Sequence, residues 1–156
     1  MSTGRRNRAL RYYLDAEFNG FGGALISIAL VPESEGALSF YGAVECRDPT
    51  PWVAEHVLPK LDIAPISYAE LQWAFADYLA ADPEPVLVAD WPEDIVHAAR
   101  LIVTDDGRRL IVSAVRFELA EVVSFSTAEL SHVPHNAWHD AVALRTFCMA
   151  RRHGSG

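Results

Sequence analysis

The stretch that decides the fold is residues 11–31, RYYLDAEFNGFGGALISIALV. Its first part, Arg11–Phe18, is rich in Tyr, Leu and Phe and favours a strand. The glycines of residues 19–23 indicate a turn. Ala24–Val31 is a continuous apolar run, which is typical of a strand that is buried on both faces. The stretch therefore predicts two strands joined by a tight turn.

The pattern on either side of this stretch predicts an α/β or α+β domain with a mixed sheet. A third strand is expected over Leu38–Val44, which extends the first two into an antiparallel meander. The region from the end of the last expected strand, at Val115, to Phe125 remains unassigned. The later expected elements are helices over Pro51–Leu58 and Ser67–Ala81 (with Ser67 and Glu70 as a capping box), a strand over Val86–Ala89, a helix from Asp90 to about Val103, a strand over Leu110–Val115, and a helix over Ala137–Arg152 with Asn136 as its N-cap.

Length and composition predict one folded domain. The chain has 156 residues, of which 51% are hydrophobic and 22% charged, and a domain typically has roughly 100–200 residues. We expect a loose arm over residues 1–10, a single domain over residues 11–152 and a tail over residues 153–156. The chain has only two cysteines, Cys46 and Cys148. This count excludes a disulfide framework and a four-thiolate metal cluster, and a packing role is favoured for both.

Charge and hydropathy narrow the class of protein further. The net charge of −8 argues against a protein that coats nucleic acid without specificity. An enzyme that binds nucleic acid at a local site is still an alternative. The N-terminus carries arginines without a following apolar segment, so it does not resemble a signal peptide. The longest apolar run, Ala24–Val31, is too short to span a bilayer. These features predict a soluble cytoplasmic protein with no membrane partner.

A pair of carboxylates lies within the first expected strand. Asp15 and Glu17 are two residues apart, so their side chains point to the same face of the strand. Two adjacent carboxylates in an apolar strand repel each other, and a divalent cation is the simplest compensation. The alternative is an edge strand whose polar face is exposed to water.

Further candidate residues lie at the starts of two expected helices. Asp94 lies in the first turn of its helix, while Asp90 and Glu93 have the spacing of a capping box. His135 and Asp140 flank the start of the last helix, where the alternatives are a surface histidine and an aspartate placed favourably near a helix N-terminus. The i, i+4 pair of His135 and His139 also suits zinc, but no third ligand of zinc type is evident.

Three of these motifs together resemble the DEDDh 3′–5′ exonucleases. Asp15-Ala16-Glu17 is similar to the D-x-E of the first family motif. The segment LVADWPEDIVH (87–97) is similar to the second, with Asp94 at the ligand position and Asp90 as its competitor. His135 and Asp140 match the H-x(4)-D of the third. Residues 52–61 further resemble the small bacterial exoribonucleases of mycobacterial type.

The resemblance implies an RNase H-like α/β fold, with a central mixed five-stranded sheet flanked by helices. It also implies a site with two Mg²⁺ ions, for which Mn²⁺ would substitute, and release of nucleoside 5′-monophosphates from an RNA 3′ end. Asp15 would bridge both ions, and Asp94 would act on the ion near the leaving group. Glu17 and Asp140 would hold the ion that carries the attacking water, and His135 would be the general base.

Several aromatic residues beside these motifs are candidates to stack on terminal bases. Phe18 and Trp91 are the predicted substrate-binding residues and Phe21 is a further candidate, whereas Trp138 is expected to pack in the core. A homodimer would add substrate-binding surface. The alternative functions are a DNA or short-oligonucleotide exonuclease of the same fold, a related phosphodiesterase, a non-catalytic RNase H-like nucleic-acid-binding module, and a zinc-binding structural protein.

Overall fold

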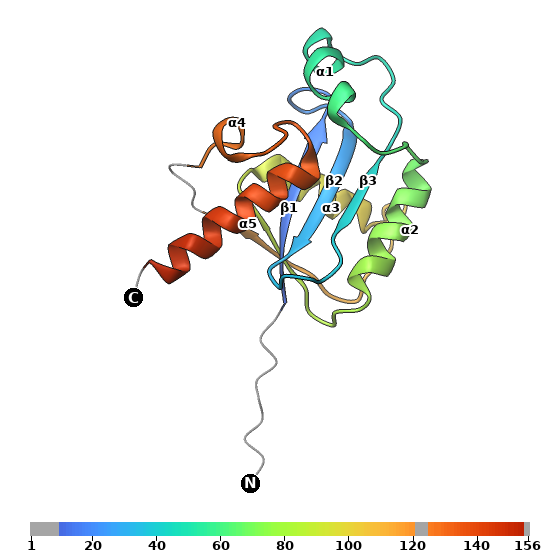
Figure 1. Ribbon diagram of the computed structural model, residues 1–156. Coiled ribbons are helices and arrows are strands. Elements are labelled where there is room, and N and C mark those ends of the chain that lie inside the picture. Colours follow the sequence, from blue (N-terminus) through green and yellow to red (C-terminus); the bar gives the residue numbers. More distant parts are fainter. Residues whose placement is uncertain (1–9, 121–124, 155–156) are drawn as a thin grey trace.

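The structure, a computed structural model, describes residues 10–120 and 125–154 (Figure 1). The arm expected at residues 1–10 lies outside the described residues except for Leu10, as do the last two residues of the expected tail. None of the helices in the described ranges combines the length and apolarity that crossing a membrane requires. In chain order the elements are β1 (Arg11–Phe18), β2 (Leu25–Pro32), β3 (Phe40–Ala43), α1 (Pro51–His56), η1 (Leu58–Lys60), α2 (Tyr68–Leu79), β4 (Val86–Ala89), α3 (Pro92–Leu101), β5 (Arg116–Leu119), α4 (Thr127–Leu130) and α5 (Ala137–His153).

The five strands form one mixed sheet in the order β3-β2-β1-β4-β5. The first three strands are the expected antiparallel meander, and β4 and β5 add in parallel on the other side of β1. Strand β1 is therefore central and runs parallel to β4, so the carboxyl ends of both strands meet at the same edge of the sheet. The predicted mixed α/β architecture is confirmed.

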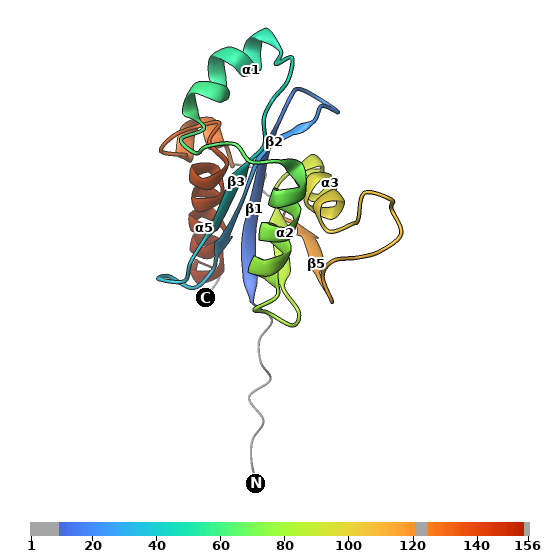
Figure 2. The same cartoon turned by 90° about the vertical axis from the view of Figure 1, so that its right-hand side faces the viewer.

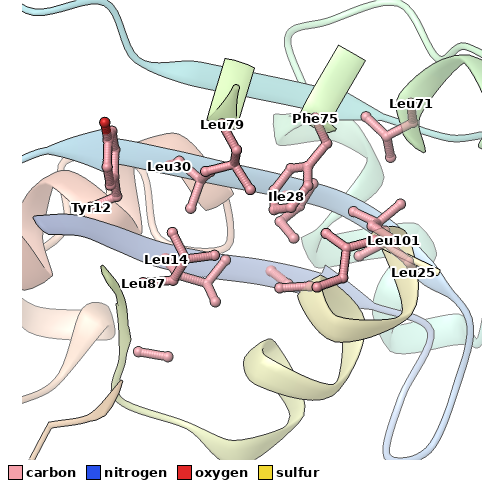
Figure 3. Packing of buried hydrophobic residues seen from close by; sticks show 14 of the residues in the cluster. Tyr12, Leu14, Leu25, Ile28, Leu30, Leu71, Phe75, Leu79, Leu87 and Leu101 are labelled. Atoms are coloured by element: carbon pink, nitrogen blue, oxygen red, sulfur yellow. The ribbon is translucent and has the colours of Figure 1, made fainter. Parts of the chain in front are cut away.

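Helices cover both faces of the sheet, as Figure 2 shows with α5 on one side and α2 and α3 on the other. On the α2 and α3 side, Leu71, Phe75 and Leu79 of α2 pack against strand residues such as Leu14 (Figure 3). On the α5 side, Tyr13 packs with Leu144. Because strand side chains alternate between faces, Asp15 lies on the same face as Tyr13, beneath α5.

Local signals explain why the two long helices begin where they do. Ser67 Oγ accepts a hydrogen bond from the Glu70 N–H (3.2 Å), and the Glu70 carboxylate accepts one from the Ser67 N–H (2.8 Å), which confirms the predicted capping box. The Asn136 side chain caps α5 by accepting from the His139 N–H. Helix α2 lies so close to the sheet that a Cβ on Gly42 would be 2.4 Å from Leu71 Cδ1.

The strand expected over Leu110–Val115 is wrong. The fifth strand is Arg116–Leu119, and Leu110 forms only an isolated bridge with Val103. The apolar side chains that suggested a strand, those of Ile111, Val112 and Val115, instead pack against the main core cluster. Hydrophobic packing beneath the sheet edge, rather than strand pairing, accounts for this apolar run.

Helix boundaries differ from the expectations at three further places. Helix α1 ends at His56, and the next residues form the short 3₁₀ turn η1, in whose first turn Pro59 is accommodated because its missing N–H is not needed there. Helix α3 ends at Leu101 rather than near Val103. Helix α4, Thr127–Leu130, lies just beyond the region up to Phe125 that the sequence pattern left unassigned, and it was not expected.

Candidate metal centre

The first two carboxylates lie on the central strand. Asp15 is only 8% exposed and Glu17 is half-buried. Because β1 has neighbours on both sides, the exposed edge-strand alternative for this pair is wrong. Two carboxylates thus lie on one face of a strand that is otherwise packed, near its carboxyl end.

Helix α3 brings a third carboxylate to the same strand. Asp94, in the first turn of α3, is 3% exposed, and its Oδ1 accepts a hydrogen bond from the Ala16 N–H at 3.3 Å. This bond links the start of α3 directly to the residue between Asp15 and Glu17. The short strand β4 and the turn after it set this position, since α3 begins three residues beyond the end of β4.

The predicted capping role of Asp90 and Glu93 is wrong. The N-cap position of α3 is Trp91, and it forms no side-chain cap bond. Glu93 instead accepts a hydrogen bond from the Gly22 N–H at 3.0 Å, which ties α3 to the β1–β2 turn. Asp90, the first residue after β4, is half-buried and lies beside the buried carboxylates of Asp15 and Asp94.

The carboxylates form two groups that share one residue. Asp15, Asp90 and Asp94 offer oxygens that all lie within 4.8 Å of one another, and Asp15, Glu17 and Asp140 do the same. Asp15 belongs to both groups. Asp90 and Asp94 complete the first group, and Glu17 of β1 and Asp140 of α5 complete the second. The structure thus brings together every carboxylate predicted for the site and adds Asp90, which the sequence left as a competitor of Asp94.

Burial and mutual repulsion raise the pKa of these carboxyl groups. Burial raises the pKa of Glu17 to about 9, with the Asp140 charge adding to the effect. Burial, followed by the charge of Asp90, raises the pKa of Asp94 to about 8. The pKa of Asp15 lies well above its usual range because the group is buried and faces Asp94 and Glu17. Without a cation, the site therefore holds protons at neutral pH.

Two buried oxygens of the site have no hydrogen-bond partner among the described residues: Asp15 Oδ2 and Asp140 Oδ1. A buried carboxylate oxygen without a donor is unfavourable, and a divalent cation is a ligand that satisfies it. All the donors are carboxylate oxygens, which suit Mg²⁺ and Mn²⁺ better than softer metals. In the described ranges, no group of three or more candidate ligands includes His135 or His139, so zinc is not supported.

The loop before α5 places His135 beside the carboxylates. Its backbone N–H donates to Asp140 Oδ2 at 3.2 Å, and its φ of 71° lies in the left-handed region. The Trp52 ring meets the imidazole edge-on, with centroids 4.9 Å apart. Burial lowers the pKa of His135 and outweighs the opposing charge of Asp140. The imidazole is consequently neutral near pH 7 and able to accept a proton.

A second set of hydrogen bonds fixes this loop. The Asn136 amide, which caps α5, donates to the Lys60 carbonyl at 2.8 Å and to the Tyr41 hydroxyl at 3.3 Å. The Tyr41 hydroxyl in turn donates to the Leu61 carbonyl. Asn136 is 4% exposed. One buried side chain therefore joins α5, β3 and the residues after α1, and it does so next to His135.

The aromatic residues predicted to bind substrate differ in exposure. Phe18 is partly buried against the core and stacks on His97, with centroids 5.0 Å apart. Trp91 is 54% exposed and Phe21 is 93% exposed, so both rings are open to solvent. The expectation that Trp138 packs in the core is wrong, because this residue is 36% exposed.

Two features of the site differ from what the sequence patterns indicated, because Asp90 joins Asp94 rather than competing with it, and α1 contributes to the surroundings of His135. Asp90 was identifiable from topology, because the first residue after a strand parallel to β1 lies at the same sheet edge as the end of β1. The contact of Trp52 and His56 with the His135 region had no local signal. It depends on α1 returning over the end of the sheet, as Figure 1 shows.

Comparison of the chain with known protein families gives no match. A search of curated proteins gives no significant match either.

Proposed function

We propose that this protein is a metal-dependent 3′–5′ exonuclease of the DEDDh type with an RNase H-like fold, and that it acts on single-stranded RNA. The observation that carries the proposal is the position of Asp15, which is common to two groups of carboxylates whose oxygens lie within 4.8 Å of one another. A shared carboxylate between two ligand groups is the arrangement that a two-ion hydrolytic site requires.

The residues fit a pair of divalent cations. Asp15, Asp90 and Asp94 would hold one ion, and Asp15, Glu17 and Asp140 the other. When bound, the ions supply positive charge that stabilises the attacking and leaving oxygens of a phosphodiester. The buried oxygens of Asp15 and Asp140 that have no hydrogen-bond partner among the described residues support this assignment.

His135 is the proposed general base. Its imidazole is neutral near pH 7 because burial lowers its pKa, so it can accept a proton from the attacking water. The hydrogen bond from its backbone to Asp140 holds the loop at the site, and the Trp52 ring restricts the imidazole from one side. The hydroxide that results would attack the phosphorus of the last phosphodiester, and the bond from phosphorus to the 3′ oxygen of the preceding nucleotide would break. The terminal nucleotide is then released as a nucleoside 5′-monophosphate, and the remaining strand ends in a 3′ hydroxyl.

Exposed rings around the centre suit the terminal bases. Trp91 directly precedes α3 and Trp52 borders His135, and these side chains are 54% and 52% exposed. Aromatic faces bind bases of any sequence by stacking. The preference for RNA rests on the resemblance to the small bacterial exoribonucleases. The mixed five-stranded sheet with helices on both faces supports the RNase H-like assignment.

The experiment is a cleavage time course with 5′-labelled and 3′-labelled single-stranded RNA and DNA. It compares Mg²⁺, Mn²⁺ and EDTA for the wild-type protein and Asp15→Asn. The proposal expects a ladder that recedes from the RNA 3′ end, needs metal and is lost in the variant. Binding without cleavage under every metal would reject it in favour of a non-catalytic nucleic-acid-binding module. The expected homodimer and cytoplasmic location stay predictions, which sedimentation velocity and cell fractionation test.

A further inference from the structure

A large hollow opens on the α2 and α3 side of the sheet. Its volume is about 1150 Å³, which exceeds the roughly 300–1,000 Å³ that small-molecule sites occupy. Figure 2 shows the β1–β2 hairpin, the first turn of α2 and helix α3 around this position. We call it the upstream groove, and the lining residues used here are Leu25, Arg47, Ile66, Tyr68, His97 and Arg100.

One contact, between Phe18 and His97, connects the upstream groove to the elements that carry the acidic centre, the carboxylates around Asp15. Phe18, the residue after Glu17, pairs with Leu25 across the β1–β2 hairpin and stacks on His97. His97 in turn lies one helical turn after Asp94. The carboxylates and the groove therefore border the same two elements, the end of β1 and helix α3, with the largely buried Phe18–His97 contact between them.

The charge of the groove suits a polyanion. Arg47 and Arg100 are exposed, and neither forms an ion pair within the described residues. Of the two acidic side chains that also line the groove, Glu70 is held in the capping box of α2, and Glu45 lies exposed. Guanidinium groups bind phosphate oxygens with two parallel hydrogen bonds, so two available arginines offer phosphate contacts beside an acidic centre that repels the same chain.

Apolar and aromatic surface accompanies the arginines. Ile66 and Tyr68 are each 38% exposed and line the same hollow. Tyr68 and Arg100 line this hollow together. Proteins that bind single-stranded nucleic acid without sequence preference combine positively charged side chains along the phosphate backbone with aromatic rings on which the bases stack.

We propose that the upstream groove binds the nucleotides that lie 5′ of the terminal one in a single-stranded substrate, with Arg47 and Arg100 on their phosphates and Tyr68 against a base. This rests on the proposed function, and it specifies the substrate class further. The enzyme takes a single strand several nucleotides long, and its affinity grows with length beyond the dinucleotide.

The test measures binding rather than cleavage. Fluorescence anisotropy compares a 5′-labelled eight-nucleotide RNA with a dinucleotide, both carrying phosphorothioate linkages and measured with Ca²⁺ in place of Mg²⁺. The double variant Arg47→Gln/Arg100→Gln is expected to lose on the order of tenfold in affinity for the longer RNA. The slope of log K against log salt should fall by about 1.4, because two single-strand phosphate contacts are lost. Dinucleotide binding should be unchanged.

The matched control is Arg116→Gln. Arg116 is also an exposed arginine, but it starts β5 and aligns through β4 with Arg11 at the first residue of β1, the opposite end of the strand from Glu17. Arg116→Gln removes one positive charge, as each substitution of the double variant does, and it should leave both affinities and the salt slope as in the wild type. Equal affinity of the wild type for the two RNAs, or a double variant that behaves like Arg116→Gln, would overturn the proposal. Dinucleotide cleavage with Mg²⁺ tests the proposed function separately, since the groove is not needed for it.

Discussion

The backbone N–H of His135 donates a hydrogen bond to Asp140 Oδ2 over 3.2 Å. The residue proposed to move a proton is thus joined through its main chain to a residue proposed to bind a cation. In this arrangement His135 has the left-handed conformation, φ 71°, which few residues other than glycine and asparagine adopt readily. A substitution that removes the imidazole but keeps this conformation therefore tests the role of the imidazole while the backbone hydrogen bond is retained.

His135→Asn is the variant that makes this separation. Asparagine tolerates the left-handed region, so the bond to Asp140 and metal binding should persist while the proton acceptor is lost. We expect the cleavage rate to fall by about 10²–10⁴-fold, the usual contribution of a general base. Single-turnover kinetics, with Mn²⁺ affinity measured in parallel, check this. His139→Asn is the control and should cleave at close to the wild-type rate, whereas equal losses in both variants would contradict the assignment.

The stability of the metal-free protein should fall as the pH rises. Glu17 and Asp94 have pKa values of about 9 and about 8 in the folded state, against about 4 in an unfolded chain. Between these values the folded state holds more protons than the unfolded state, so the free energy of unfolding decreases with increasing pH. Thermal unfolding in EDTA should give a lower Tm at pH 8.5 than at pH 5.5.

Added Mn²⁺ should reverse this trend, because a cation replaces the protons that the carboxylates otherwise hold. The rise in Tm on adding Mn²⁺ should be larger at pH 8.5 than at pH 5.5. A Tm that is independent of pH in EDTA, or the same metal effect at both pH values, would mean that the buried carboxylates are not coupled to folding.

Asp94→Asn should stabilise the metal-free protein at pH 8 while abolishing cleavage. The substitution removes a charge that burial and Asp90 oppose, and such changes at functional sites commonly add about 0.5–2 kcal/mol to the free energy of unfolding. Urea denaturation in EDTA provides the measurement.

Asp82→Asn is a matched buried control, for which the free energy of unfolding should decrease. The reason is that the Asp82 carboxylate accepts hydrogen bonds from the Tyr12 hydroxyl and the Glu84 N–H. Destabilisation by both variants would contradict the account of the acidic centre.

Asn136→Ser tests whether the bonds behind His135 matter for activity. Serine also caps helices, so α5 should persist, but the donors to the Lys60 carbonyl and the Tyr41 hydroxyl are lost. We expect a loss of about 1–3 kcal/mol in the free energy of unfolding and a lower kcat with little change in KM. Steady-state kinetics below the Tm of the variant check this, and a kcat equal to that of the wild type would show that the loop is fixed by other contacts.

Much of the fold could be predicted because its signals are local. The capping box at Ser67, the N-cap at Asn136 and the β1–β2 turn each depend on a few adjacent residues. The strand expected over Leu110–Val115 failed because an apolar run does not specify whether it pairs with a strand or packs beneath one.

The candidate site was predictable to the extent that its carboxylates lie at the ends of strands and the starts of helices. These positions made Asp15, Asp94 and Asp140 candidates, and the resemblance to the exonuclease motifs selected them as ligands. The capping pattern at Asp90 was misleading, because the same residue type serves both a helix N-terminus and a buried cluster. The approach of Trp52 to His135 depends on how α1 folds back over the sheet, and no pattern within one segment carries that information.

The claim on which the rest depends is that the carboxylates around Asp15 hold two divalent cations. Calorimetric titration of Mn²⁺ into metal-free protein at pH 7.5 tests it most directly, with Asp15→Asn and the buried control Asp82→Asn alongside. We predict two saturable sites in the wild type and in Asp82→Asn, and the loss of both in Asp15→Asn, since Asp15 belongs to both ligand groups. A folded wild-type protein that shows no saturable binding, or binding that Asp15→Asn leaves unchanged, would contradict the account.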